Sequence, residues 1–478
     1  MTLELAALPY DVVLMILQQP SLGLVELCRL ECCSRTMRSL IDDKIWRQAF
    51  LRHRRCNALR EPESWKGEYL RRESYSRQWR NLPNGLGASG LRNGQRLVGN
   101  TAQKLRRFTQ KFMPGSPTSP PARMETHVVE QNSKTPGIHA TISAALLASK
   151  PFDRIQIRRG VYTERLRLDK PVELVGAGAA ESVVLIGVDG PAIEISSKIV
   201  SRVANMKIEQ KAHTGGGAMS GTVLIKGGAV LCIEECIISS ETGHCVIIQG
   251  LDTHGVVQHN MVQHGKGVGV LVCDHGRGHI EDNDISHNGR AGVAILSGAD
   301  PYVYCNKIHE GMDSGVLVSE RGRGRIEDND IFANRRAGVA ILKEGSPLVK
   351  HNRIHDGRDS GVLVCEHGQG SVIDNDIFAN RMAGVAIGRG GASRVTGNTI
   401  RDGNGGSLCL SMHSRGLISS NIIHQDPRAV MQVPEGLLPE VQQHNMIQYS
   451  DDIQPMDIDH NPRAGTASPC VYGMQQCM

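Results

Sequence analysis

The stretch "RGRGRIEDNDIFANRRAGVAI", residues 321–341, has two near copies, "HGRGHIEDNDISHNGRAGVAI" at 275–295 and "HGQGSVIDNDIFANRMAGVAI" at 367–387. The copies follow one another at steps of 46 residues, whereas the Asn and Gly inside them recur at half that step. A regular step without insertions is typical of a solenoid in which each repeat stacks on the one before it. The stretch therefore predicts a repeat fold, and it raises the question of why the chain has two periods.

The shorter period is 23 residues, and it is carried by one column of asparagines and one of glycines. The asparagines are Asn260, Asn283, Asn306, Asn329, Asn352, Asn375, Asn398 and Asn421, and the glycines are Gly269, Gly292, Gly315, Gly338, Gly361 and Gly384, followed by Ser407. Alternating apolar residues beside them predict short strands that point Val, Leu and Ile into the solenoid. Coils about 4.8 Å apart would let each Asn side chain hydrogen-bond to its equivalents in the neighbouring coils.

The longer period coincides with alternating charge. The residue after each Asn is Asp284, Lys307, Asp330, Arg353 and Asp376 in turn, and the residue two before each Gly is Arg290, Asp313, Arg336, Asp359 and Met382. Like charges stacked at strand spacing repel, whereas opposite charges gain about 0.2–1 kcal/mol per exposed pair. We therefore interpret the 46-residue period as charge balance between neighbouring coils.

Composition supports a repeat fold and excludes few partners. The chain has 478 residues, 53 of them Gly, and only 4% aromatic residues, which indicates many tight turns around an aliphatic core and more than one structural unit. The net charge of +5 is mild, although the segment between Pro83 and Thr126 contains seven Lys or Arg and only one acidic residue. We interpret that basic segment as a solvated tether, and we expect neither nucleic acid nor a membrane as a partner.

The N-terminal segment carries a family resemblance. "LPYDVVLMIL" at residues 8–17 and "LCRLECCSRTMRSLIDDKIW" at 27–46 have apolar residues at helical spacing. Together they resemble an F-box, with mild departures at Cys32 and at Thr36 and Met37. The resemblance implies docking on the adaptor subunit of an SCF ubiquitin ligase, and through it on a cullin. The implied adaptor-binding residues are Leu8, Pro9, Ile16, Leu17, Leu40, Ile41 and Trp46.

The pattern of apolar and polar residues changes at residue 135. "TPGIHATISAALLASK", residues 135–150, predicts one amphipathic helix, and "DRIQIRRGVYTERLRLDKPVELVGAG" alternates short strands with turns. This order resembles the entry to pectin-lyase-like right-handed parallel β-helices, in which a helix covers the first coil. The expected fold class is multidomain, with a small all-α F-box followed by an all-β right-handed parallel β-helix of 23-residue coils. The expected boundaries are 1–55 for the F-box, 56–82 for a helical extension, 83–135 for a disordered basic linker, 136–448 for the capped β-helix and 449–478 for a disordered tail.

An F-box joined to a β-helix resembles a class of F-box proteins whose β-helix recruits substrates. The resemblance implies a non-catalytic receptor of an SCF ubiquitin ligase that binds a protein substrate and needs no cofactor. The turn residues recurring at 46 positions are polar and expected to be exposed, so they form either a row of solvated turns or a substrate-binding surface. The candidate substrate-binding residues are His275, Arg277, Arg321, Arg323, Arg325 and His367.

Two other functions stay open. One is a carbohydrate-active β-helix enzyme, for which Asp313 and Asp359 would be the catalytic carboxylates. Their position between Arg290 and Arg336 favours a structural role, because neighbouring cations stabilise the ionised form. The other is a binding scaffold that acts outside any ligase.

Metal binding and export are not expected. His351 with His355, or His275 with His279, would lie about 13 Å apart on a strand, too far to share a zinc ion. Thirteen Cys lie without a metal or disulfide spacing, no Asn-x-Ser/Thr sequon occurs, and the N-terminus lacks the features of a signal peptide. These features predict a cytoplasmic or nuclear protein.

Overall fold

The computed structural model describes residues 125–212, 221–412, 414–426, 429 and 431–449. The chain divides after residue 104 into two units, and all described residues belong to the second. The expected F-box, the helical extension and most of the basic linker therefore lie outside the described residues, as does the tail beyond residue 449. No helix in the described part of the chain is long and apolar enough to span a membrane.

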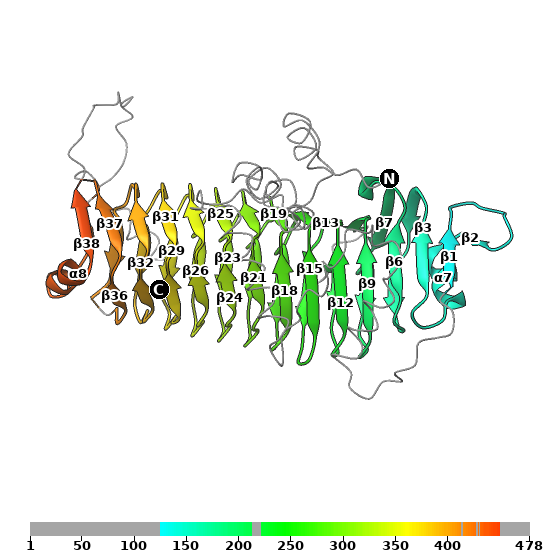
Figure 1. Ribbon diagram of the computed structural model, residues 1–478, viewed down its shortest axis with the longest axis horizontal. Coiled ribbons are helices and arrows are strands. Elements are labelled where there is room, and N and C mark those ends of the chain that lie inside the picture. Colours follow the sequence, from blue (N-terminus) through cyan, green and yellow to red (C-terminus); the bar gives the residue numbers. More distant parts are fainter. Residues whose placement is uncertain (1–124, 213–220, 413, 427–428, 430, 450–478) are drawn as a thin grey trace, which may run out of the picture. The chain divides into compact units, whose positions relative to one another are not determined.

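The described unit is a parallel β-solenoid whose coils each pass through three sheets, here called A, B and C (Figure 1). Sheet A has 14 strands: β1 Thr126–Val129, β2 Ile138–His139, β3 Arg154–Ile157, β6 Glu173–Gly176, β9 Val200–Ala204, β12 Val230–Glu234, β15 His254–Gln258, β18 Arg277–Glu281, β21 Tyr302–Tyr304, β24 Arg325–Glu327, β27 Leu348–Lys350, β30 Ser371–Ile373, β33 Arg394–Thr396 and β36 Leu417–Ser419. Sheet B has 13 strands: β4 Gly160–Thr163, β7 Val183–Val188, β10 Lys207–Lys211, β13 Ile237–Ser240, β16 Met261–Gly265, β19 Asp284–Ser286, β22 Lys307–His309, β25 Asp330–Phe332, β28 Arg353–His355, β31 Asp376–Phe378, β34 Thr399–Arg401, β37 Ile422–Gln425 and β38 Met446–Tyr449. Sheet C has 11 strands: β5 Leu166–Leu168, β8 Ile193–Ile195, β11 Gly221–Ile225, β14 His244–Gln249, β17 Val270–Cys273, β20 Val293–Ile295, β23 Val316–Val318, β26 Val339–Ile341, β29 Val362–Val364, β32 Val385–Ile387 and β35 Leu408–Leu410.

Strand pairing follows the 23-residue step through most of the unit. Lys307 pairs with Asp330 in sheet B, and Val316 pairs with Val339 in sheet C. The earlier coils are longer, since Val200 pairs with Val230, 30 positions on. All pairs are parallel, so each coil rests on the previous one with its equivalent residues in register. The solenoid of about 23-residue coils expected from the sequence is confirmed.

The core is one continuous cluster of aliphatic side chains inside the coils. In the 23-residue coils from β19 to β34, the middle residue of the sheet B strand and the outer two residues of the sheet C strand point inward and are fully buried, as Ile331, Val339 and Ile341 show. Burying such a side chain contributes about 1.5–3 kcal/mol. The repetition of these residues in every coil stabilises the whole stack.

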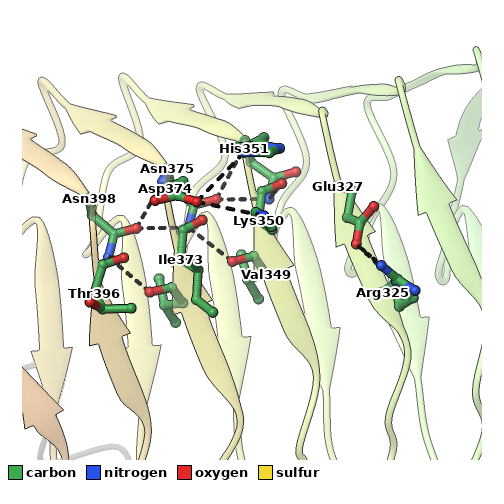
Figure 2. A network of polar contacts seen from close by, with 12 residues as sticks. Arg325, Glu327, Val349, Lys350, His351, Ile373, Asp374, Asn375, Thr396 and Asn398 are labelled. Carbon is green, nitrogen blue, oxygen red and sulfur yellow. Dashed lines mark hydrogen bonds and ion pairs between the residues drawn. The ribbon is translucent and has the colours of Figure 1, made fainter. Parts of the chain in front are cut away.

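The column of asparagines lies buried at the turn between sheets A and B. Asn375 Nδ2 donates to Asn398 Oδ1 at 2.9 Å, and Figure 2 shows this contact beside the bond from Asn375 to the Val349 carbonyl. The same side-chain contact joins neighbours from Asn260 to Asn421, and Asn445 extends it by one coil. Each Oδ1 also accepts the backbone N–H of the preceding Asn, as in Asn352 with Asn329. The ladder therefore satisfies backbone groups that the turn would otherwise bury without a partner.

A short helix covers the first coil, but the solenoid begins earlier than expected. Helix α7, Ile142–Ala148, packs Ile142 and Leu146 into the core, and the Thr141 hydroxyl accepts a hydrogen bond from the Ala144 N–H. The prediction of one helix over residues 135–150 was wrong. Residues 138–139 form β2, because they pair with β1, and the cap at Thr141 starts the helix only there.

The expected β-helix boundary at residue 136 also needs correction. Strand β1 starts at Thr126 and pairs with both β2 and β3, so sheet A includes the last part of the segment interpreted as linker. At the other end, helix α8, Leu438–His444, and β38 close the stack, and α8 buries Val441. A 3-10 turn, η2 at Ala180–Ser182, follows the "GAGA" segment.

Candidate functional site

The site is built on the row of turns that leads from sheet C to sheet A. In successive coils the two residues at the turn tip are 274–275, 297–298, 320–321, 343–344 and 366–367, and all have positive φ, as Glu320 (53°) and Arg321 (60°) show. Each turn is closed by a backbone hydrogen bond, such as Gly322 N to Ser319 O at 2.8 Å. We call these residues the tip row. Two left-handed residues in sequence turn the chain sharply and leave their polar side chains at the surface.

A hollow of about 620 Å³ lies along the tip row over four consecutive coils. Its lining residues are His275, Ser297, Gly298, Glu320, Arg321, Arg323, Lys343 and Glu344. The His275 ring lies against Gly298, where an added Cβ would be 2.7 Å from its Nδ1. The absence of a side chain at Gly298 therefore gives the ring its place at the edge of the hollow.

The structure brings together three of the six residues predicted to bind substrate. His275, Arg321 and Arg323 line the hollow, whereas Arg277 stands at the start of β18 outside it. Arg325 lies on β24 and donates through Nε to Glu327 at 2.9 Å, a contact visible in Figure 2. His367 occupies the tip row one coil beyond Glu344.

Sequence reasoning missed four lining residues of this hollow, namely Ser297, Gly298, Lys343 and Glu344. It followed the 46-residue period of the quoted copies and so skipped alternate coils. The 23-residue step from His275 to Gly298, Arg321 and Glu344 was the signal that could have found them.

The electrostatics of the hollow combine one tight ion pair with further cations. Arg321 Nε donates to Glu344 Oε2 at 2.7 Å, and this contact raises the pKa of Arg321 and lowers that of Glu344. Ser297 Oγ donates to Glu320 Oε2 at 2.9 Å. Arg323 and Lys343 are exposed and have no ion-pair partner within the described ranges. The hollow can therefore accept a carboxylate or another anionic group through charge-assisted hydrogen bonds.

The two carboxylates considered for catalysis lie on a different row of turns, between sheets B and C. Asp313 Oδ1 accepts the backbone N–H of Ser314 at 2.8 Å and lies 3.6 Å from Arg336 Nε in the next coil. Asp359 Oδ1 likewise accepts the N–H of Ser360 at 2.6 Å. Both side chains hold their own turns in shape.

The charge column of sheet B has a partner that the sequence analysis did not identify. Asp330 pairs in register with Arg353, 3.9 Å away, but its closer partner is His355 Nε2 at 2.9 Å. Asp284 meets His309 Nε2 in the same way at 3.1 Å. The His309, Phe332, His355 and Phe378 rings stack along the outside of sheet B, with centroids 4.5–5.4 Å apart.

The histidines whose spacing suggested a zinc site contact separate carboxylates. His351 lies 3.7 Å from Asp374, which Figure 2 shows, whereas His355 contacts Asp330 and Asp356. His275 belongs to the tip row, and His279 Nε2 contacts Glu281 Oε2 on β18 at 2.6 Å.

Sheet A also carries buried polar side chains that were not among the predicted substrate-binding residues. Arg202 bridges Glu173 and Glu234 from the two neighbouring strands, and Arg154 Nε donates to Glu173 at 2.7 Å. Three coils further on from Glu234, the Tyr302 hydroxyl donates to Glu327 Oε2 at 3.2 Å. Burial raises the pKa of the Tyr302 phenol, and the nearby Glu327 carboxylate adds to this, so the phenol stays protonated.

Comparison with protein families assigns the two parts of the chain. A model described as "Right handed beta helix region" matches residues 180–308, 244–378 and 303–436, which together span more than half of the chain. A model described as "F-box-like" matches residues 5–52. The expected residues Leu8 to Trp46 fall within that match, although their structure lies outside the described residues.

Three solved structures are reported among those to which the described part of the chain is similar. The complex of XylC with xylose has 12% sequence identity and a TM-score of 0.53, covering 69% of this chain and 86% of that one. The Azotobacter vinelandii mannuronan C-5 epimerase AlgE6 A-module has 15% identity and a TM-score of 0.40, covering 65% and 94%. The Dettilon tailspike protein has 12% identity and a TM-score of 0.40, covering 68% of each chain. At such identities the likeness concerns the fold alone.

Proposed function

Because this chain belongs to the right-handed β-helix family and carries an F-box-like domain, we propose that it is the substrate receptor of an SCF-type ubiquitin ligase. The F-box-like domain implies binding to the SCF adaptor, and the adaptor would connect the chain to a cullin. The β-helix would hold a protein substrate near the ubiquitin-charged enzyme. The gain in rate would come from effective concentration and orientation, so no residue of this chain would need to react.

The observation that carries the receptor role is the hollow on the tip row. Arg323 and Lys343 supply exposed positive charge next to the Arg321–Glu344 pair, on the same rigid stack of coils. This arrangement fits an extended segment of a substrate protein that carries carboxylates. Such a segment would lie along the tip row and contact several coils at once. The role requires the ubiquitin machinery, so we propose that the protein acts in the cytoplasm or the nucleus.

One experiment tests the hollow. Full-length protein with Arg323→Ala and Lys343→Ala is compared in cells with the wild type and with a matched control, Arg335→Ala and Arg358→Ala. The control removes two exposed arginines from the turns between sheets B and C. Each form is expressed in cells from which the gene for this protein has been deleted. Ubiquitin-site proteomics then measures which proteins carry ubiquitin in each cell line. We expect the hollow variant to lose substrates that the control retains, while both copurify adaptor and cullin equally. Equal modification by both variants would refute the hollow as the substrate site.

A second experiment tests the ligase role independently. Leu8→Ala with Pro9→Ala should abolish copurification of adaptor and cullin, because both residues lie in the F-box-like segment. The substrate should still bind the variant. Retained adaptor binding would contradict docking through these residues, and a wild type that copurifies neither adaptor nor cullin would favour a scaffold outside the ligase.

The alternative of a carbohydrate-active enzyme can be tested directly. Purified protein is incubated with polyuronides, and product formation is compared with the Asp313→Asn and Asp359→Asn variants. The receptor role predicts no turnover by any form, since both carboxylates are engaged by their own turns. Turnover that either substitution abolishes would overturn the proposal of a non-catalytic receptor.

A further inference from the structure

Four side chains with metal-ligating atoms meet at the first coil, far from the tip row. Glu125 directly precedes β1 and His127 is its second residue, whereas His139 belongs to β2 and Asp153 directly precedes β3. Strand β1 pairs with both β2 and β3, with His127 opposite Ile155. This pairing places next to one another residues that are 12 to 28 positions apart in sequence. The sequence shows no metal motif here because strand pairing alone creates the cluster.

The distances suit a shared ion. His127 Nε2 lies 3.1 Å from Asp153 Oδ2, and one oxygen of Glu125, the His127 nitrogen and one oxygen of Asp153 all lie within 4.8 Å of one another. Donor atoms bound at 2.0–2.2 Å around a tetrahedral zinc ion are about 3.3–3.6 Å apart. Asp153 and His127 already have nearly this spacing, so only the exposed Glu125 side chain needs to move inward.

The cluster is held in place before any ion binds. Asp153 is 2% exposed, its Oδ1 accepts the Glu125 N–H at 2.9 Å, and its Oδ2 accepts the Lys150 N–H at 2.7 Å. On the other side of the imidazole, His139 Nε2 lies 3.3 Å from His127 Nδ1. A metal-binding histidine commonly uses its second ring nitrogen for such a contact, which sets the ring's orientation and tautomer.

We propose that Glu125, His127 and Asp153 bind one divalent transition-metal ion of the zinc type, with water in the fourth position and His139 positioning the His127 ring. One imidazole and two carboxylates form a donor set that such ions accept. The ion would tie the residue at which the described solenoid begins to the turn before β3. Lys150 Nζ lies 3.6 Å from Glu125 Oε1, but both side chains are largely exposed, so the ion displaces only a weak pair.

The test uses the full-length protein, freed of metal with a chelator, and zinc chloride as the probe. Isothermal titration calorimetry measures stoichiometry and affinity, and visible absorption after cobalt substitution reports the ligand set. The variants are Glu125→Gln, His127→Gln and His139→Ala, with Glu130→Gln as matched control. Glu130 is an acid directly after β1 that pairs with Arg158 instead. Asp153 is left intact because it also accepts two backbone N–H groups.

We expect one site that is lost in His127→Gln and weakened more than tenfold in Glu125→Gln. His139→Ala should weaken it by about tenfold, the lower end of the range for outer contacts, and Glu130→Gln should leave it unchanged. Circular dichroism of each variant without metal checks that the coils remain folded. The proposal is overturned if no zinc binds, or if the binding seen is insensitive to Glu125 and His127, as sites on the Cys residues would be. Loss in His139→Ala with no change in Glu125→Gln would also contradict it, by placing the ion between the two histidines.

Discussion

Asn334 Oδ1 accepts a hydrogen bond from the backbone N–H of Gly311 in the preceding coil at 3.0 Å, while its Nδ2 donates to the Ile308 carbonyl. A Cβ at Gly311 would be 3.0 Å from that same oxygen, tighter than an ordinary contact. The relationship recurs between Gly265 and Asn288 and between Gly357 and Asn380. Each of these asparagines thus packs against a glycine of the preceding coil. This packing, in addition to the alternating charge, explains why the sequence repeats every two coils.

Replacing Asn334 by Ala should destabilise the solenoid by about 2 kcal/mol, because it leaves the buried Gly311 N–H and Ile308 carbonyl without their partner. Urea unfolding monitored by circular dichroism measures this change. The neighbouring exposed residue Arg335 gives the control, since Arg335→Ala should change the midpoint little. Equal effects of the two substitutions would contradict the role assigned to Asn334.

Gly361 tests the column of glycines at the start of sheet C. A Cβ there would be 2.5 Å from Ile377 Cγ2 and 2.7 Å from the Gly384 carbonyl oxygen. We expect Gly361→Ala to cost about 2 kcal/mol through overpacking. Gly436→Ala is the matched control, because nothing lies within 4 Å of its Cβ position. Differential scanning calorimetry should show a lower melting temperature for the first variant only.

Arg202 tests the buried ion network on sheet A. Its side chain is 15% exposed between Glu173 and Glu234, whereas Arg158 pairs with Glu130 at the surface with 49% exposure. Arg202→Ala leaves two partly buried carboxylates without their shared cation and should cost about 3 kcal/mol. Arg158→Ala should cost under about 1 kcal/mol. The prediction fails if chemical denaturation gives similar losses for both.

The His–Asp contacts of sheet B predict a pH dependence. Burial disfavours the charged His355 ring, but hydrogen bonds to Asp330 and Asp356 outweigh this and raise its pKa above the ordinary 6.5. His309 behaves alike through Asp284 and Glu310. Because the folded-state pKa is the higher one, this stabilisation is complete below pH 6.5 and is lost as the pH rises through the raised value.

The measurement is the urea midpoint between pH 5.5 and 8.5. Wild-type stability should fall across the upper part of this window, and His309→Gln with His355→Gln should flatten the curve. His367→Gln is the control, because it changes a residue of the exposed tip row. Its urea midpoint should depend on pH in the same way as that of the wild type. A double variant with an unchanged pH profile would show that these two rings do not couple to the neighbouring carboxylates.

Much of the fold could be predicted from the sequence because a solenoid repeats the same local pattern of buried and turn residues in every coil. The spacing of Asn260, Asn283 and Asn306 predicts the coil length, and the alternation in "GVAI" predicts which side chains face inward. The cap was harder. The pattern over residues 135–150 allows a longer helix, and only pairing with β1 shows that residues 138–139 are a strand.

The candidate site was predicted only in part, for a related reason. The 46-residue copies draw attention to His275 and Arg321, but the hollow also needs Lys343 and Glu344 from the intervening coil. Residues that are similar in sequence are two coils apart, whereas residues that touch are one coil apart and differ in sequence. Contact across the tip row therefore follows the 23-residue step.

By itself, the sequence determined the repeat, its register, the buried Asn column and the F-box-like segment, because each depends on residues at a fixed distance along the chain. Only the tertiary structure decided which side chains contact one another across neighbouring coils and strands. It placed Asn334 over Gly311, His355 against Asp330, and Glu125, His127 and Asp153 together. The physical reason is that lateral contacts depend on which strands pair and on the room each side chain leaves, and neither is encoded by a local pattern.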